Sequence, residues 1–373
     1  GQWFVGGQPD LSLHITSIAD WPRLQAEVAA WLEIHPGAQA VGLINYHAGE
    51  ALAGVASNYR NHLPMAVIHC YSPEQLHAGD FTECLDLLAA ASANARLTAP
   101  FVSRMSQSDY LRRVTRIQDY LLAGDAYQVN FARQFSAQMN SDPLSVWIRL
   151  ARAHPAPHAC YVPHDEGAVF GVSPERFLRI EEKQITSEPI KGSRPRLNNP
   201  QEDAAMAQAL LASGKDRAEN LMIVDLMRND LGKVCQTGSV ETSSLFELRR
   251  FSNVQHLVST VTGQLREGIS PLDALLACFP GGSITGAPKK RAMEIIAELE
   301  TAARHFYCGS QFSIDADQNL DSSILIRTFQ YRDGQLICHG GGGIVADSDP
   351  QAEYQESAFK VEALMASLSV LES

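Results

Sequence analysis

Two segments of the chain place acidic residues three positions apart at the start of predicted helices. Asp216 and Glu219 open a helix predicted over 216–231, and Glu353 and Glu356 open one that runs to about residue 368. Residues three apart share one helix face, so each segment presents two carboxylates together. If the two helices met, the four carboxylates could bind a hard cation such as Mg²⁺. The alternative is that these acids complement the helix dipole and face solvent.

A lysine between two prolines is a candidate nucleophile. Lys191 lies in the segment Pro189-Ile-Lys-Gly-Ser-Arg-Pro195. Near a low-dielectric pocket such a lysine can lose its proton and attack a substrate, whereas the usual alternative is a solvated loop lysine. Glu175 follows Ser-Pro and is a candidate general acid, or a turn glutamate. His256 is more often a satisfied core histidine than a catalyst.

Two glycine-rich segments could bind anions. Gly340–Gly343 follow a predicted strand, and four missing side chains would expose amide N–H groups, unless the run is only a flexible tight loop. Residues 280–289 have the glycine spacing of a P-loop but lack its Lys-Ser/Thr pair. What remains is a loop leading into a helix predicted over 288–299, whose N-terminus could face an anion.

The elements that position these residues combine helices with strands. A helix is predicted behind the capping pair Ser106 and Asp109, ending at Gly124, and a strand over 127–135 has a polar face. Residues 325–331 and 335–339 form a predicted hairpin. Further strands are predicted at 159–162, 168–172 and 177–180, with helices at 21–32, 75–94 and 202–213, the last closed by Gly214. Without regular βαβ alternation, this pattern indicates an α+β fold of largely antiparallel sheets.

Composition narrows the class of protein. The chain has 373 residues, with 42 acidic against 30 basic side chains and a formal charge of −12. That excess argues against a nucleic acid or an anionic membrane surface as partner. No apolar stretch approaches the roughly 20 residues that span a bilayer. The seven cysteines are odd in number and widely spaced, which favours a reducing cytoplasm over a disulfide framework.

The motifs, taken together, resemble those of the chorismate-binding enzyme family and occur in the family's order over about residues 106–366. The resemblance implies one domain over 1–373, with a shortened N-terminal part at 1–100 and a catalytic core at 106–366. It also implies two packed, largely antiparallel sheets flanked by helices. The matching segments are Gly124–Asn130, Ser173–Phe177, Pro189–Ser193, Lys215–Asp230, Gln255–Ser259, Pro280–Lys289, Ile326–Thr328 and Gly341–Glu356.

The resemblance also assigns roles to individual residues. Glu219 and Glu356 would ligate Mg²⁺, with Asp216 and Glu353 holding its waters. Lys191 would be the nucleophile and Glu175 the general acid, with His256 assisting substrate positioning or proton transfer. The residues that would hold the substrate chorismate are Gln128, Thr285, Gly286, Tyr307, Arg327, Gly341, Gly342, Gly343 and Lys360.

Two positions indicate the reaction within the family. Gln128 stands where water-activating members carry a lysine, so ammonia is the expected nucleophile. Lys191 stands where anthranilate-forming members carry alanine, which indicates amination to 4-amino-4-deoxychorismate through a covalent lysine intermediate, for para-aminobenzoate and folate synthesis. No glutaminase segment is found, so a separate glutamine amidotransferase subunit (component II) is the expected ammonia source. The alternatives are an anthranilate-forming enzyme and an inactive chorismate-binding assembly subunit.

Three features depart from the family pattern. Ser193 replaces the usual threonine, and the segment Cys308–Phe312 lacks the Gly-Tyr pair that commonly follows its serine. The N-terminal region, which builds a tryptophan pocket in many relatives, is shortened. We therefore expect no tryptophan site.

Overall fold

The computed structural model describes residues 3–59, 62–89, 97–250 and 254–369, and their contacts group into two units. Unit 1 comprises residues 1–174, 284–317 and 323–373, and unit 2 comprises residues 175–283 and 318–322. The chain therefore leaves unit 1 twice and returns to it twice. The expectation of one domain over 1–373 stays a prediction.

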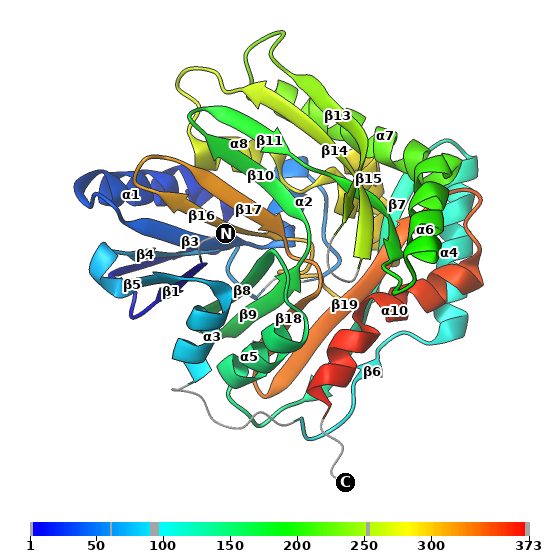
Figure 1. The fold of residues 1–373 in the computed structure, drawn as a ribbon, viewed down its shortest axis with the longest axis horizontal. Coiled ribbons are helices and arrows are strands. Elements are labelled where there is room, and N and C mark those ends of the chain that lie inside the picture. Colours follow the sequence, from blue (N-terminus) through cyan, green and yellow to red (C-terminus); the bar gives the residue numbers. More distant parts are fainter. Residues whose placement is uncertain (1–2, 60–61, 90–96, 251–253, 370–373) are drawn as a thin grey trace. The chain divides into compact units, whose positions relative to one another are not determined.

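Unit 1 contains a sheet in which every neighbouring pair of strands is antiparallel (Figure 1). The predicted hairpin of β18 and β19 is confirmed and turns at Asp333 and Gly334, whose φ angles of 50° and 73° are left-handed. In order across the sheet, the strands are β15 (Gly286–Ala287), β7 (Gln128–Gln138), β19 (Gln335–Ile344), β18 (Thr328–Arg332), β9 (Gly167–Ser173) and β8 (His158–His164), and β6 (Val102–Ser103) also pairs with β7.

A second antiparallel group of strands in unit 1 packs against this sheet. Its order is β16 (Ser310–Asp315), β3 (Gln39–Ile44), β4 (Ala66–Tyr71) and β2 (Leu11–Ile15), and β1 (Trp3–Gly6) pairs separately with β5 (Leu76–Gly79). Leu43 of β3 shares a hydrophobic cluster with Val162 and Val169 of β8 and β9. Two packed, largely antiparallel sheets are thus confirmed. The helix predicted over 75–94 is wrong at its start, where β5 forms instead.

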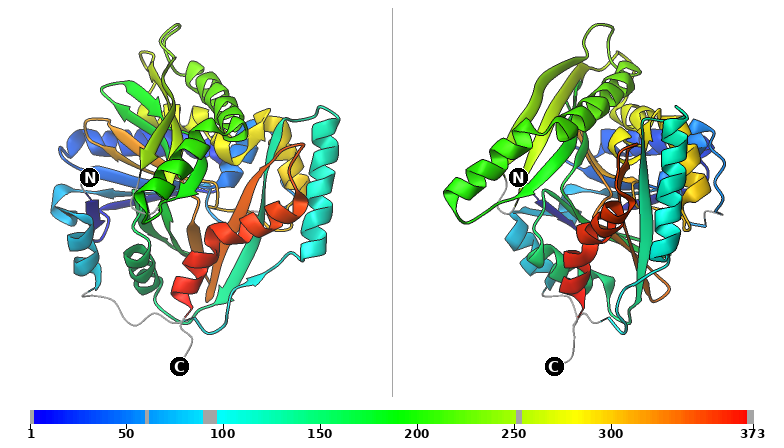
Figure 2. Two further views of the ribbon diagram at one scale, coloured as in Figure 1. Left: turned by 45° about the vertical axis from the view of Figure 1, so that its right-hand side comes forward. Right: turned by 90° about the vertical axis from the view of Figure 1, so that its right-hand side faces the viewer.

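Helices cover the outer face of the first sheet. Tyr110 and Ile117 of α4 pack with Val129 and Phe131 of β7. The predicted cap is confirmed, because the Ser106 hydroxyl accepts the Asp109 N–H at 3.2 Å. In unit 1 the structure places helices η1 (Ile18–Asp20), α1 (Trp21–Ile34), α2 (Tyr46–Ala53), η2 (Pro73–Gln75), α3 (Phe81–Ala89), α4 (Gln107–Leu122), α5 (Pro143–Ala153), α9 (Lys289–Leu299) and α10 (Pro350–Leu368). In Figure 2, α10 crosses β19.

Unit 2 is a smaller antiparallel sheet with helices on it. Its strands follow the order β12 (Ile190–Pro195), β14 (Val254–Gln264), β11 (Gln184–Ser187) and β10 (Arg176–Glu181), and β13 (Glu241–Arg250) also pairs with β14. Its helices are α6 (Pro200–Ala212), α7 (Gly214–Gly232), α8 (Pro271–Cys278) and η3 (Gly282–Ile284), which ends at the unit boundary, and β17 (Leu320–Ile324) is divided between the units. Figure 2 shows α7 running along β13 and β14. Gly214 begins α7, because the Ser213 hydroxyl caps that helix.

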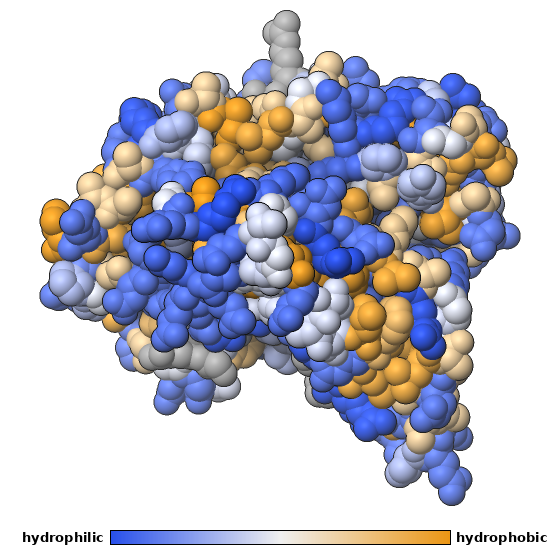
Figure 3. All heavy atoms as spheres, turned by 90° about the horizontal axis from the view of Figure 1, so that it is seen from above, coloured by the Kyte–Doolittle hydropathy of each residue, from blue (hydrophilic) through white to orange (hydrophobic). Residues whose placement is uncertain are grey.

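The surface carries the polar character expected from the composition. Hydrophilic residues cover most of the face seen in Figure 3, and hydrophobic residues gather there in several patches. Among the described residues, no helix has the length and apolar character needed to cross a bilayer.

Candidate active site

The glycine run of unit 1 lies inside strand β19 rather than after it, so the alternative of a flexible tight loop is wrong. Gly340–Gly343 continue the antiparallel ladder with β7. Helix α10 packs so closely that a Cβ atom at Gly340 would collide with the carbonyl oxygen of Ser357. The Lys360 ammonium of the same helix donates to the carbonyl oxygen of Gly341 at 2.9 Å. Glycine is therefore required here by the close approach of helix and strand.

Three charged side chains of α10 meet above Gly342. A Cβ atom on this glycine would lie 3.2 Å from a Glu353 carboxylate oxygen and 3.4 Å from the Lys360 Nζ atom. A Glu356 oxygen is 3.7 Å from the same position and 2.7 Å from the Lys360 ammonium. The Ser348 hydroxyl donates to the other Glu353 oxygen at 2.8 Å. The two carboxylates thus share one helix face, as their spacing predicted.

The polar face predicted for the strand at 127–135 is present on β7. Gln128, Asn130 and Gln134 alternate with apolar residues and are all buried. Neither polar atom of the Gln128 side-chain amide has a hydrogen-bond partner among the described residues. The Asn130 N–H donates to the Thr285 carbonyl oxygen at 2.8 Å, and the neighbouring Gly286 pairs with β7. A buried amide with unused hydrogen-bonding capacity is suited to a polar ligand.

Tyr307 and Arg327, both predicted to hold carboxylates, also lie in unit 1. The Tyr307 ring stacks on that of His339, with ring centroids 4.8 Å apart and planes 12° apart. Burial lowers the pKa of the His339 imidazole to about 3, so the ring is neutral. Arg327 is half-buried at a φ of 51°, and burial lowers its pKa. No carboxylate of the described residues pairs with it, so an anionic substrate group would be a favourable partner.

The sequence analysis missed a buried ion pair behind this polar face. Arg304 and Glu300 pair at 2.7 Å, and both side chains are almost fully buried. The guanidinium also donates to the carbonyl oxygens of Asn130 and Ile284, each at 2.9 Å, and Glu300 accepts the Ala132 N–H at 2.9 Å. The pair fixes strand β7 where Gln128 and Asn130 project. In the sequence this pair shows only as an acidic and a basic residue four positions apart. The same spacing is common on exposed helices, so it does not indicate a buried pair.

Lys191 of unit 2 lies in a bulge of strand β12. Lys191 and Gly192 together stand opposite the single residue Leu257 of β14. Gly192 has a φ of 78°, and a Cβ atom there would lie 3.0 Å from two carbon atoms of the Asp216 side chain. A bulge redirects the side chains of its strand. Half-buried Lys191 is therefore placed by a local irregularity that only glycine at 192 permits.

The acidic pair of unit 2 opens helix α7. The Ser213 hydroxyl accepts the Asp216 N–H at 3.2 Å, and the Asp216 carboxylate accepts from Arg194 of β12 at 2.9 Å. Glu219 lies 4.0 Å from the Lys215 ammonium and retains 20% side-chain exposure. Asp216 thus links the helix to the Lys191 strand, and Glu219 is the more accessible carboxylate.

Glu175 and His256 are each buried and hydrogen-bonded to a serine. The Ser283 hydroxyl donates to a Glu175 carboxylate oxygen at 2.8 Å. The Ser193 hydroxyl and His256 Nδ1 are 2.7 Å apart, on paired strands. Glu175 is 7% exposed and His256 4%. A buried carboxyl group that already accepts a hydroxyl hydrogen bond makes Glu175 the candidate proton donor of this set.

The four acidic residues expected to bind Mg²⁺ are divided, two in each unit. Among the described residues, no group of three or more His, Cys, Asp or Glu side chains is placed to hold a metal ion. Each unit offers one accessible carboxylate, Glu356 in unit 1 and Glu219 in unit 2, beside a second that accepts a protein hydrogen bond. These donors fit Mg²⁺, which takes one or two protein carboxylates and completes its shell with waters and substrate oxygens.

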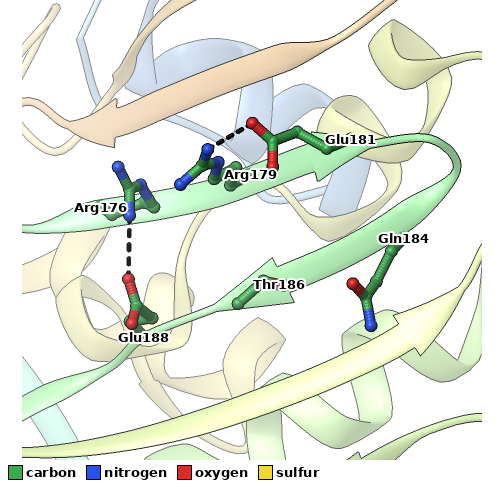
Figure 4. Close-up of a pocket in the computed structure, with 6 residues that line it drawn as sticks. All are labelled: Arg176, Arg179, Glu181, Gln184, Thr186 and Glu188. Carbon is green, nitrogen blue, oxygen red and sulfur yellow. Dashed lines mark hydrogen bonds and ion pairs between the residues drawn. The ribbon is translucent and has the colours of Figure 1, made fainter. Parts of the chain in front are cut away.

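A hollow of about 180 Å³ lies on β10 and β11 of unit 2, outside this set of residues. Its charged side chains neutralise one another: Arg176 pairs with Glu188 at 3.0 Å, and Arg179 pairs with Glu181 (Figure 4). Gln184 and Thr186 complete the lining. The hollow contains none of the predicted catalytic residues, and the pairing of its charged side chains leaves them no net charge to attract an anion.

Comparison with known proteins decides the family. The model of the chorismate binding enzyme family matches residues 8–366. The chain belongs to this family. Aminodeoxychorismate synthase component 1 of Klebsiella aerogenes is 49% identical over 277 residues, and that of Escherichia coli K12 is 48% identical over 272. These matches cover 74% and 73% of this chain but only 61% and 60% of the relatives, so the chain spans about three fifths of their length.

Other family members are similar but more distant. Anthranilate synthase component 1 of Aquifex aeolicus is 41% identical, over 72% of this chain and 55% of the relative. The crystal structure of anthranilate synthase component I from Streptococcus pneumoniae superposes with a TM-score of 0.81 at 24% identity, covering 98% of this chain and 92% of that one. That structure supports the chorismate-binding fold predicted from the motifs.

Proposed function

We propose that this protein is component I of an aminodeoxychorismate synthase, a transferase that converts chorismate and ammonia to 4-amino-4-deoxychorismate for para-aminobenzoate and folate synthesis. The observation that carries the proposal is Lys191, held in a bulge of strand β12 whose Gly192 packs against Asp216 of helix α7. The 48–49% identity to relatives of that name supports it.

The proposed chemistry has two displacements. The neutral Nζ of Lys191 bonds to C2 of chorismate, both ring double bonds shift (C1=C2 to C1=C6 and C5=C6 to C4=C5), and the C4–O bond breaks as Glu175 gives its proton to the departing hydroxyl. Ammonia then bonds to C4, both double bonds shift back, and the Nζ–C2 bond breaks with its electron pair returning to Lys191. The Glu175 carboxylate takes the excess proton from the new ammonium group, so water is the only by-product. Two displacements account for retained position and configuration at C4.

The remaining residues bind and orient the substrate. Arg327, Tyr307 and Lys360 would hold its carboxylates, with the amides of Gly341–Gly343, and Thr285 and Gly286 would complete the pocket. His256 would assist positioning or proton transfer. When bound, Mg²⁺ would neutralise the ring carboxylate, with Glu219 and Glu356 as ligands and Asp216 and Glu353 holding its waters.

Gln128 supports ammonia rather than water as the nucleophile. Its amide is buried and can hydrogen-bond to a ligand, but an amide cannot remove a proton from water. Ammonia is nucleophilic without a base. We propose a glutamine amidotransferase subunit as its source, in keeping with the "component 1" in the names of the relatives, and the cytoplasm as the location.

Product analysis tests the function. The protein is incubated with chorismate, Mg²⁺ and ammonium, and the products are separated by chromatography. We expect 4-amino-4-deoxychorismate and no pyruvate. Fluorescent anthranilate with stoichiometric pyruvate would establish the second candidate, anthranilate synthase, which the 41% identity to the Aquifex enzyme favours. Chorismate binding without turnover at saturating ammonium and Mg²⁺ would indicate an inactive assembly subunit.

A further inference from the structure

Arg133 of strand β7 carries a buried guanidinium. Its side chain projects from the apolar face of the strand, and the residue is 3% exposed. Its Nε donates to the Ser357 hydroxyl at 2.9 Å, and its Nη2 donates to the Tyr354 carbonyl oxygen at 3.0 Å. No carboxylate of the described chain lies within ion-pair distance. Burial of a charge without a counter-charge destabilises the folded state, so an apolar side chain in this position would be more favourable for folding.

Three aromatic rings surround this guanidinium. Its Cζ atom lies 3.9 Å from the ring centroid of Tyr354, 4.9 Å from that of Phe135 and 5.7 Å from that of Tyr110. A cation over an aromatic face is attracted by the ring quadrupole, and the attraction grows when water is excluded. The aromatic rings therefore replace the missing carboxylate and hold the positive charge in place.

Both hydrogen bonds of Arg133 and its nearest ring contact fall on one turn of helix α10. Tyr354 and Ser357 are each the next residue after Glu353 and Glu356, and the Ser357 hydroxyl also donates to the Tyr354 carbonyl oxygen at 2.7 Å. The Tyr110 hydroxyl donates to the backbone carbonyl oxygen of Glu353 at 3.3 Å. Arg133 thus holds this turn of α10 against strand β7 and fixes its rotation about the helix axis. The same turn presents both carboxylates at Gly342.

We propose that Arg133 is a positioning residue that sets the divalent-cation affinity of the acidic turn at residues 353–357. It acts through the helix and touches neither carboxylate, because its donors contact only the Tyr354 backbone and the Ser357 hydroxyl. The part that concerns Mg²⁺ rests on the proposed function. The fixing of the turn does not, and it can be measured without metal.

The first test is calorimetric titration of Mg²⁺, in the presence of chorismate, into wild type and Arg133→Met. Methionine fills similar space but cannot donate. We expect about tenfold weaker Mg²⁺ binding, comparable to loss of an outer-shell partner, with kcat recovering at saturating Mg²⁺. The matched control is Arg116→Met, because Arg116 also lies over an aromatic ring, 4.3 Å from the Tyr120 centroid, but bonds to Tyr120 and Asp119 of its own helix, α4. A folded Arg133→Met protein that binds Mg²⁺ within twofold of wild type would overturn the proposal.

The second test is hydrogen–deuterium exchange of the metal-free protein. In Arg133→Met, we expect amides at 354–358 to exchange about tenfold faster, with those at 362–368 unchanged. Arg133→Lys, which keeps a cation in the aromatic cage, should lie between Arg133→Met and wild type. If Arg133→Met does not fold, the same exchange measurement is made on Ser357→Ala, which removes only the hydroxyl that accepts from the Arg133 Nε. Unchanged or uniformly faster exchange refutes the role of Arg133, whereas a wild type that binds no Mg²⁺ refutes only the metal assignment.

Discussion

The two units contribute candidate residues held by different physical means. In unit 1 they lie on or against regular strands: Gln128 is buried on β7, and three charges of α10 meet above Gly342. In unit 2 the proposed nucleophile, Lys191, lies in a bulge, beside a glycine with a left-handed φ. Regular strands buried on both faces give a rigid binding surface, whereas a bulge aims one reactive side chain. Under the proposed function, the candidate residues of unit 1 would bind substrate and Lys191 of unit 2 would supply the reactive group.

The strongest test of this division removes the reactive group of unit 2. Lys191→Ala should lower kcat by at least about 10³-fold, as expected when a covalent nucleophile is lost, with little change in chorismate affinity. Product formation by chromatography and chorismate binding by calorimetry measure the two effects. Lys183→Ala, an exposed turn lysine of the same unit, is the matched control. Unchanged turnover in Lys191→Ala would exclude the covalent route.

The next test removes a proposed metal ligand from unit 1. Glu356→Gln keeps the shape of the side chain but loses its charge, so Mg²⁺ affinity should fall by about 100-fold or more. Glu362→Gln, an exposed acid on the same helix, should leave the affinity unchanged. Calorimetric titration compares the two variants, and equal affinities would remove Glu356 from the metal site.

A smaller effect is expected from one methyl group in the binding surface. Gly342→Ala would place a Cβ atom 3.2 Å from Glu353 and 3.4 Å from Lys360, closer than ordinary contact. Because these charges must shift, we expect the KM for chorismate to rise by about tenfold, with a lesser change in kcat. Gly232→Ala in α7 meets no atom within 4 Å and serves as the control. If kcat falls by a larger factor than KM rises, the assignment of unit 1 to binding is contradicted.

The mildest test uses pH. Burial lowers the pKa values of His164 and His305 to about 4 and of His339 to about 3, all in unit 1. The unfolded chain takes up these protons near pH 6.5 and the folded chain does not, so stability is full above that pH and falls progressively toward pH 4. We expect the Tm to drop by about 5 °C or more between pH 7 and pH 5. His339→Phe should reduce this slope, and an equal slope would contradict the neutral buried ring.

The sequence predicted elements well where a local pattern decides them. The helix behind Ser106 and the β18–β19 hairpin depend on capping and on turn residues, and both are confirmed. The helix over 75–94 failed at its start because residues 76–79 pair with β1, some 70 positions away. The predicted strand at 335–339 stops short of the glycine run because nothing nearby in sequence shows that β7 pairs with the run and that α10 packs on it. Distant partners decide both outcomes.

The candidate residues divide in the same way. Acid spacing predicted that Glu353 and Glu356 share a helix face, and their meeting at Gly342 agrees. Arg133 and His339 gave no signal, and Arg304 gave only its four-residue spacing from Glu300, because the burial of all three depends on segments distant in the chain. Motif order identified the family, but only coordinates show which charges are held by aromatic rings or by a buried partner.

The hydrogen bond from Ser283 to Glu175 joins the last and the first residue of the long segment of unit 2. This segment is therefore an insertion whose two ends adjoin, the arrangement that lets one folded module be placed within a loop of another. Exchange of residues 175–283 between family members would transfer Lys191, its bulge and the proposed general acid Glu175 together. The recipient protein would keep its own strand β19. Such a chimera is therefore expected to form the product of the protein that donated the segment.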